Sequence, residues 1–141
     1  MIDATVRQGE PDLNGAGQLL MRGMNHAKSA AHCTDNESGY VLLYYAAHKA
    51  ISAVLLAKGI YIESGERGHK VLISEAKNHF GADHAALLSR LDRARRKRNN
   101  VAYGTEEIES AELAAMTNDA KETLGAAYQL VQEQKQSPAS D

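Results

Sequence analysis

The residues of this sequence best suited to chemistry lie in one short basic segment, residues 90–98. Six of its residues are basic and one is acidic, a local charge of +5 in a chain of net charge −2. Arginine suits phosphate because its planar guanidinium donates two parallel hydrogen bonds and keeps its charge near neutral pH. The segment therefore indicates contact with an anionic ligand. A basic run is also typical of a solvated face paired with acidic residues, here those of the last helix, and this alternative stays open.

Arg98 differs from the other basic residues in the side of its helix that it occupies. At 100° per residue it lies about 20° from Leu91 and about 40° from Ala102, on the apolar stripe. An inward guanidinium needs a carboxylate, an array of carbonyl groups, a partner subunit or a bound phosphate. We therefore expect Arg98 to be the cation that meets an anionic ester. The predicted nucleic-acid contacts around it are Arg93, Arg95, Arg96, Lys97 and Asn99.

The elements that must position these residues are predicted to be helices. The two prolines, Pro11 and Pro138, lie near the ends of the chain, and no alternating pattern of useful length indicates a strand. Apolar residues recur at helical spacing in four long stretches and a short one. We therefore predict an all-α fold, an antiparallel bundle of four long helices plus one short helix.

Local signals predict the bounds of the first two helices. The first begins near Asp12, and a capping box formed by Thr34 and Glu37 opens the second. Gly59 ends the second helix. Residues 59–68 contain three glycines and mixed charges, which indicate a loop.

Similar signals bound the later helices. A short helix covers residues 69–79, and Asp83 caps the next long helix, which ends near Gly104 with Ala102 among its inward residues. Thr105, followed by two glutamates, opens the last helix. The domain is expected to span residues 12–131, after an N-terminal arm over 1–11 and before a flexible tail over 132–141.

The composition bears on location as well. The single cysteine, Cys33, cannot form an intramolecular disulfide, and the N-terminus has no basic-then-apolar signal pattern. The longest apolar stretches are interrupted by His48, Lys49 and Lys58, so we expect no membrane span. A cytoplasmic protein is the expectation.

The segment 95–104, Arg-Arg-Lys-Arg-Asn-Asn-Val-Ala-Tyr-Gly, follows a tyrosine-rich second helix that ends Ala-Lys-Gly. With these features the chain resembles a HEPN domain (higher eukaryotes and prokaryotes nucleotide-binding) over about residues 12–131. The family signature is an arginine and a polar residue, commonly Asn, with a histidine after four to six intervening residues. Arg98 and Asn99 match its start, but Tyr103 stands where the histidine is expected.

The resemblance implies a fold and a function. Members of the family are helical bundles that commonly dimerise, and many are metal-independent endoribonucleases, often toxins of toxin–antitoxin pairs. It implies RNA or a nucleotide as ligand, a homodimer, an antitoxin or operon partner, and no cofactor. Tyrosine begins protonated near neutral pH, so Tyr103 suits hydrogen bonding to phosphate, acid catalysis or base stacking better than base catalysis.

His48 is the candidate for the missing proton-transfer group, because it lies at the centre of the apolar face of the second helix. The predicted catalytic residues are therefore Arg98, Tyr103 and His48. The simpler interpretation of His48 is a core histidine bonded to Tyr44 or to a carbonyl, and Tyr44 and Tyr45 have the spacing of core residues. No histidine has the paired spacing of a zinc site, so no metal is expected.

Three interpretations of the function remain open at this stage. The chain is either a HEPN-like protein that engages RNA or a nucleotide, or a non-catalytic helical module whose basic run contacts an acidic protein surface. In a third interpretation the arginines only form structural ion pairs. Loss of function on changing Arg98 but not Arg93 separates the first from the others.

Overall fold

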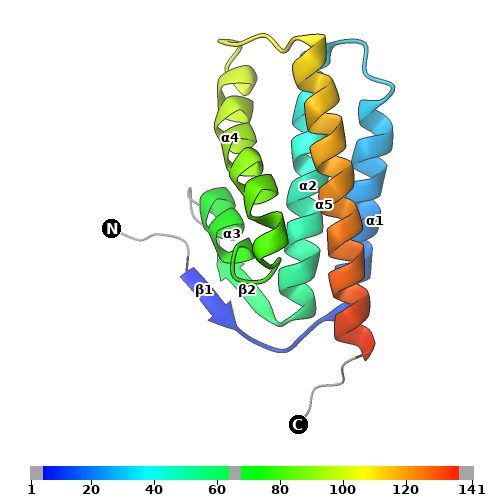
Figure 1. Ribbon diagram of the computed structural model, residues 1–141, viewed down its shortest axis with the longest axis vertical. Coiled ribbons are helices and arrows are strands. Elements are labelled where there is room, and N and C mark those ends of the chain that lie inside the picture. The colour runs from blue at the N-terminus through cyan, green and yellow to red at the C-terminus, as the bar shows by residue number, and fades with distance from the viewer. Residues whose placement is uncertain (1–4, 64–67, 137–141) are drawn as a thin grey trace.

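The computed structural model describes residues 5–63 and 68–136, and these are mostly helical (Figure 1). Four long helices are present in this part of the chain, together with the short helix α3 and a turn of 3-10 helix. This confirms the predicted all-α class, to which the structure adds a small two-stranded sheet. The helices are α1 (Leu13–Ala30), α2 (Asn36–Ala57), α3 (Gly68–Ala76), α4 (Ala85–Ala102) and α5 (Ser110–Gln136), with η1 (Ala82–His84) before α4.

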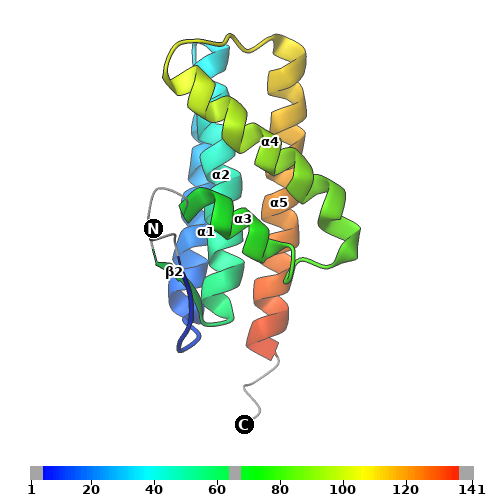
Figure 2. The ribbon, with the colours of Figure 1, turned by 90° about the vertical axis from the view of Figure 1, so that its left-hand side faces the viewer.

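The long helices alternate in direction, and α2 lies at their centre (Figures 1 and 2). Helices α1, α2 and α5 lie side by side, whereas α4 crosses them obliquely with α3 beside it (Figure 2). Small buried residues of α2, including Ala46 and Ala50, let the neighbouring helices approach closely. At Gly23 of α1 a Cβ would lie 2.9 Å from the carbonyl oxygen of Ala46, so this contact requires glycine.

Helix α2 is long and apolar enough to cross a membrane by length and composition alone. Most of its apolar segment, 61% of the residues, is buried inside the fold. Tyr44, Ile51 and Leu55 are among its fully buried side chains. The apolar character of α2 is therefore accounted for by its position in the core.

One of the two predicted caps of the first two helices is correct and the other is wrong. Asp12 caps α1 as predicted, because its carboxylate accepts from the backbone N–H of Gly15. The predicted Thr34 cap is wrong: Asp35 caps α2 by accepting from the N–H of Ser38 at 2.9 Å. The carboxylate of Glu37 instead accepts from the backbone N–H of Ile108 at 2.7 Å. Glu37 thus holds the α4–α5 connection against the start of α2.

Two further expected helix starts are also corrected. Asp83 lies within η1, and α4 begins at Ala85 without a side-chain cap. The hydroxyl of Thr105 donates to the carbonyl of Asn100, so Thr105 closes α4 and the last helix begins only at Ser110. Helix α4 ends at Ala102, close to the predicted end near Gly104. Gly104 has φ +74°, a backbone conformation that glycine often adopts after a helix.

The packing faces of the last two helices differ slightly from the predicted ones. Val101 is buried near the end of α4, whereas Ala102, predicted to face inward, is exposed. Helix α5 extends to Gln136, into the segment predicted to be a flexible tail. Residues 137–141 of that tail lie outside the described residues.

The expected loop over 59–68 contains a strand. Strand β2 (Ile60–Glu63) pairs antiparallel with β1 (Thr5–Gln8), which lies in the predicted N-terminal arm. Gly59, with φ +77°, makes the turn out of α2 and accepts from the N–H of Gly9. A Cβ on Gly59 would lie 2.4 Å from the carbonyl oxygen of Gly9, so this corner requires glycine. Residues 64–67 of the expected loop lie outside the described residues.

Candidate functional site

Arg98 extends from α4 toward two tyrosines of α2. Its guanidinium donates to the hydroxyl of Tyr45 at 3.2 Å, and its central carbon lies 5.3 Å and 5.5 Å from the ring centroids of Tyr44 and Tyr45. Within residues 5–63 and 68–136 it forms no salt bridge, and its Nε is buried without a hydrogen-bond partner. Aromatic rings attract a cation without cancelling its charge. The positive charge of Arg98 is therefore available to an anion.

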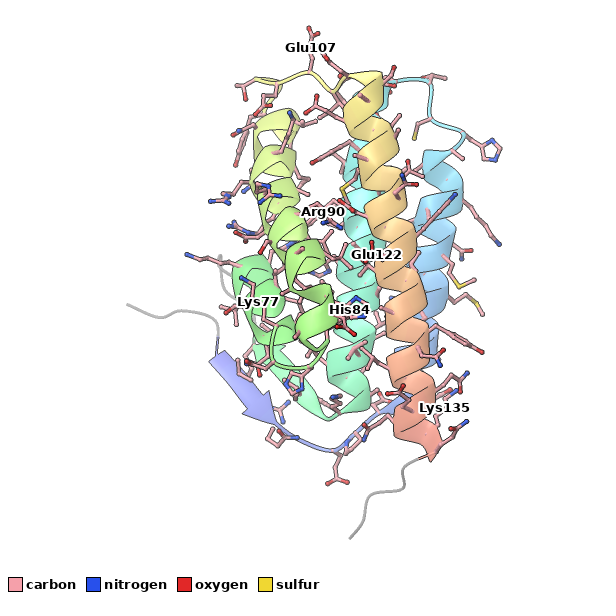
Figure 3. All side chains as sticks on the ribbon, viewed as in Figure 1. Lys77, His84, Arg90, Glu107, Glu122 and Lys135 are labelled. Atoms are coloured by element: carbon pink, nitrogen blue, oxygen red, sulfur yellow. The ribbon has the colours of Figure 1, made fainter. Side chains whose placement is uncertain are left out.

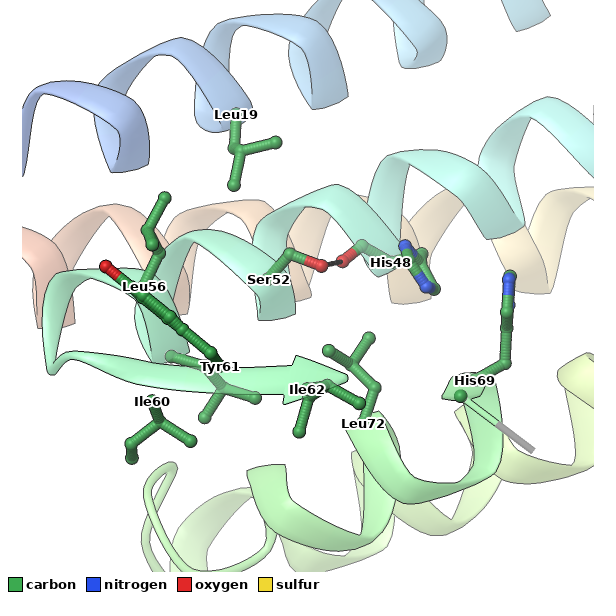
Figure 4. Close-up of a pocket in the computed structure, with 11 residues that line it drawn as sticks. Leu19, His48, Ser52, Leu56, Ile60, Tyr61, Ile62, His69 and Leu72 are labelled. Atoms are coloured by element: carbon green, nitrogen blue, oxygen red, sulfur yellow. Dashed lines mark hydrogen bonds between the residues drawn. The ribbon is translucent and has the colours of Figure 1, made fainter. Parts of the chain in front are cut away.

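A pair of histidines lies beside this arginine. His48 of α2 and His69 of α3 have ring centroids 4.2 Å apart (Figure 4). Both Arg98 and His48 pack near Tyr45, since the His48 ring centroid is 6.4 Å from that of the tyrosine. The structure thus brings together two of the three predicted catalytic residues, Arg98 and His48, and adds His69.

The hydrogen bond with Tyr44 determines which ring nitrogen of His69 carries the proton. Tyr44 is almost fully buried, and its oxygen lies 3.0 Å from Nδ1 of His69. Burial raises the pKa of Tyr44 well above its usual value, so the hydroxyl keeps its proton and needs an acceptor. Nδ1 is that acceptor, and neutral His69 then carries its proton on Nε2.

Both histidines are held in the neutral form. Burial, followed by the charges of His69, Lys49 and Arg98, lowers the pKa of His48 to about 3. Burial and the nearby positive charge of Arg98 also lower the pKa of His69. Nδ1 of His48 is buried without a partner, so Nε2 is the nitrogen of that ring able to meet a ligand. The site offers a fixed cation beside two uncharged imidazoles.

Four helices supply the residues around Arg98, and sequence reasoning missed several of them. His26 of α1 lies near Tyr45, with ring centroids 6.5 Å apart, and His69 comes from α3. Tyr44 is a core residue, as its spacing predicts, whereas Tyr45 is half-buried against the core. Both also hold the arginine. The i, i+4 spacing of Tyr44 and His48 was the available signal for a cluster. No local signal places His69 against them, because α3 is brought there by the fold.

Other basic residues of the 90–98 segment are paired with acids of α5 and the loop before it. Arg90 contacts Asp119 at 3.1 Å and Glu122 at 3.6 Å, and Figure 3 shows Arg90 and Glu122 facing each other. Lys97 contacts Glu112 of α5 and Glu106 of the preceding loop, and these hydrogen bonds raise the pKa of Lys97 to about 12. This part of the basic run is the paired face that the sequence left open as an alternative.

The remaining predicted nucleic-acid contacts have different surroundings. Arg95 and Arg96 share Asp92, at 3.1 Å and 3.4 Å, on their own helix. Arg93 is exposed and forms no ion pair with any described residue. Asn99 is partly exposed, and its backbone carbonyl accepts from the N–H of Tyr103. Arg93 is thus the outward arginine best placed to meet a polyanion.

Tyr103 lies apart from this cluster. It is the C-cap of α4, and 82% of its surface is exposed. No hydrogen bond or ring contact joins it to Arg98 or His48 in the described structure. Within one copy of the chain, therefore, Tyr103 is not part of the constellation that contains Arg98.

A pocket of about 510 Å³ opens beside the histidine pair (Figure 4). His48 and His69 line one end of it, and the rest of the wall is mostly aliphatic. Leucine and isoleucine side chains come from α1, α2, β2 and α3: Leu19, Leu55, Leu56, Ile60, Ile62 and Leu72. The pairing of β1 with β2 therefore has a local consequence, because it fixes one wall of this pocket.

Comparison with known proteins does not assign the chain to a family. A scan against protein-family models found no match, and a search of the curated proteins found none either. In the described residues there is also no group of three or more His, Cys, Asp or Glu placed to hold a metal ion. The geometry around Arg98 and the short motif that contains it are therefore the features of the molecule that bear on function.

Proposed function

We propose that this chain is a HEPN-like protein that binds RNA or a nucleotide through Arg98 and cleaves RNA without a metal ion. The observation that supports this most is the inward guanidinium that packs on tyrosine rings and has no carboxylate partner in the described structure. A structural arginine would be expected to pair with an acid, as Arg90 does. A phosphate would supply the missing negative charge and satisfy the remaining guanidinium donors.

The cluster contains the groups that such a cleavage needs. The 2′-oxygen attacks the adjacent phosphorus while Nε2 of His48 accepts its proton, and Arg98 stabilises the charge that develops on the phosphoryl oxygens. The bond from phosphorus to the 5′-oxygen then breaks, and this oxygen takes a proton. Tyr45 accepts from Arg98, so its own proton is free for that oxygen. A bound phosphate would also raise the pKa of His48 and make it a stronger base.

The test is cleavage of a single-stranded RNA by the purified chain in excess EDTA. Arg98→Gln is expected to lower the rate by about 100-fold or more, the usual effect of removing a group that stabilises transition-state charge. Lys121→Gln is the control, because Lys121 is an exposed cation of α5 outside the basic segment. We expect less than about a threefold change for it.

Each outcome of this assay has a definite meaning. His48→Asn is expected to reduce cleavage by about 100-fold with RNA binding retained, as for loss of a proton-transfer group. Cleavage that stops in EDTA, or that persists in Arg98→Gln, contradicts the proposed enzyme. Arg98-dependent binding without any cleavage supports the binding function and removes the enzymatic one.

The proposal includes a homodimer, which would give Tyr103 a role. This side chain is exposed at the end of α4 and is therefore accessible to an RNA bound on a second copy. Sedimentation of the full chain is expected to show a dimer. If Tyr103→Phe lowers cleavage, mixing these chains with inactive Arg98→Gln chains should restore part of it, and a strictly monomeric chain would contradict this arrangement.

A second candidate is a non-catalytic module that binds a protein, such as an antitoxin or operon partner. The observation in its favour is a set of exposed large apolar side chains outside the Arg98 region, on α1 and α5. These are Met21 with 64%, Met24 with 48% and Tyr128 with 55% of their surface exposed. For this function, Met21→Ser with Met24→Ser should abolish partner binding, and Arg98→Gln should leave it unchanged.

A further inference from the structure

The pocket beside the histidine pair continues the line of residues that begins at Arg98. Along α2, Tyr45 holds Arg98, His48 follows three residues later, and Ser52 follows four residues after that. At 1.5 Å per residue these steps are about 4.5 Å and 6 Å along the helix axis. The anion site, the imidazoles and the pocket therefore follow one another along α2. Figure 4 shows the two histidines at one end of the pocket.

The walls of the pocket suit a flat ring with a polar edge. Leucine and isoleucine side chains cover its sides, and its volume of about 510 Å³ is in the usual range for a small-molecule site. Two polar residues, Ser52 and His69, are among those that line it, and their side chains have complementary roles. Nε2–H of His69 is a donor, because Tyr44 occupies its other nitrogen. The hydroxyl of Ser52 donates to the backbone carbonyl of His48 at 2.9 Å, so its oxygen can still accept a hydrogen bond.

A nucleobase has this combination of properties. Its two faces pack against aliphatic or aromatic side chains, and its edge carries both donors and acceptors. A fatty-acyl chain would also fill aliphatic walls, but it offers no hydrogen-bond partner to the Ser52 oxygen or to the His69 N–H. The polar groups therefore favour a base over a lipid tail.

We propose that this pocket, lined by Ser52, Ile62, His69 and Leu72, is the subsite for one nucleobase of the bound RNA or nucleotide. The base occupies the pocket, its ribose lies against His48, and its phosphate reaches Arg98. This inference rests on the proposed function, because it takes the anion at Arg98 to be the phosphate of the same nucleotide. It adds that a base, and not only the phosphate backbone, determines affinity.

The test measures binding of five small probes to the full chain by calorimetry: AMP, UMP, ribose 5-phosphate, inorganic phosphate and decanoate. At least one of the two nucleotides is expected to bind about tenfold more tightly than ribose 5-phosphate, which lacks the base. Arg98→Gln should weaken every phosphate-containing probe. The advantage of the nucleotide over ribose 5-phosphate should persist in that variant.

Ser52→Leu separates the pocket from the anion site, because it fills the pocket and leaves Arg98 in place. It is expected to abolish the advantage of the nucleotide and to leave ribose 5-phosphate binding within about twofold. Ser29→Leu is the matched control, since Ser29 is an exposed serine of α1, and it should change nothing. If Ser52→Leu does not fold by circular dichroism, nuclear Overhauser effects in the native chain replace it. Base protons should then contact the methyl groups of Ile62 and Leu72.

The outcomes distinguish this inference from the proposed function. If ribose 5-phosphate binds as tightly as both nucleotides and all require Arg98, the base subsite is wrong and phosphate binding at Arg98 stands. Binding of decanoate but not of nucleotides, lost in Ser52→Leu, overturns the base subsite in favour of an apolar tail. If no phosphate compound and no RNA binds, both proposals are wrong.

Discussion

The two sides of α4 hold basic residues of one segment in opposite electrostatic situations. On the side facing α5, Arg90 and Lys97 are paired with carboxylates of α5 and its preceding loop. On the side facing α2, Arg98 has tyrosine rings, a tyrosine hydroxyl and neutral histidines around it. We call these the outer face and the inner cluster. The local charge of +5 therefore does not describe the electrostatic surroundings on either side of α4.

The difference shows which cation is free to act. A paired surface arginine must exchange its carboxylate for a phosphate, and the gain is small because one charge contact replaces another. Arg98 makes no such exchange with the part of the chain that the structure describes, since its partners there are uncharged. The same surroundings make the two regions respond to different conditions. The inner cluster should be sensitive to pH, and the outer face should be sensitive to salt.

The largest expected effect is the loss of stability of the inner cluster in acid. In the folded chain the pKa of His48 is about 3, because of its burial and its neighbours His69, Lys49 and Arg98, against about 6.5 in an unfolded chain. Between these values the unfolded chain binds a proton that the folded chain does not. The free energy of unfolding should therefore fall as pH decreases through this window, by up to about 1.4 kcal/mol per pH unit from His48 alone.

Urea unfolding of His48→Gln between pH 7 and 4.5 isolates this contribution, because protonation of the carboxylates is common to both proteins. The variant should have a shallower pH dependence than the native chain. His32→Gln is the control, since His32 is an exposed histidine, and it should leave the slope unchanged. An identical slope in His48→Gln would show that His48 is not held neutral by burial.

A smaller effect is expected at the hydrogen bond that holds Arg98. Tyr45→Phe removes the hydroxyl that accepts from the guanidinium at 3.2 Å and keeps the ring beneath it. The loss should be about 1 kcal/mol of stability, and a double-mutant cycle with Arg98→Met should show that most of it depends on the arginine. Tyr128→Phe, at an exposed tyrosine of α5, is expected to have no effect. Additive losses in the cycle would mean that Tyr45 acts independently of Arg98.

The helix signals that were reliable are those that act within a few residues. Asp12 caps α1, and the positive φ angles of Gly59 and Gly104 follow the ends of α2 and α4, as the sequence predicts. The prediction that Thr34 caps α2 was wrong because its neighbour Asp35 is an equally suitable cap. Spacing alone does not choose between the two residues. Glu37 was unavailable for a capping box, since it accepts from Ile108, a residue distant in the sequence.

The parts of the site that escaped prediction depend on contacts between distant segments. Each strand of the sheet has four residues, too few for an alternating pattern, and β1 precedes β2 by the whole of two helices. His69 is placed against Tyr44 by the packing of α3 in the same way. The inward position of Arg98 was predictable from helical periodicity, but its tyrosine partners were identified only as core residues. Tyr103, chosen by its spacing in the motif, faces solvent.

The smallest expected effect is at the outer face. Lys97→Met removes the contacts of the ammonium group with Glu112 and Glu106, and it should lower stability by less than about 1 kcal/mol at low salt. The difference should disappear in about 1 M NaCl, where the Debye length is about 3 Å. Equilibrium unfolding at both salt concentrations measures it, with Tyr45→Phe as the variant whose loss persists in salt because its contact involves a neutral hydroxyl. If the loss of stability in Lys97→Met is the same at both salt concentrations, the Lys97 pairs are shielded from solvent. The contrast between the two sides of α4 is then wrong.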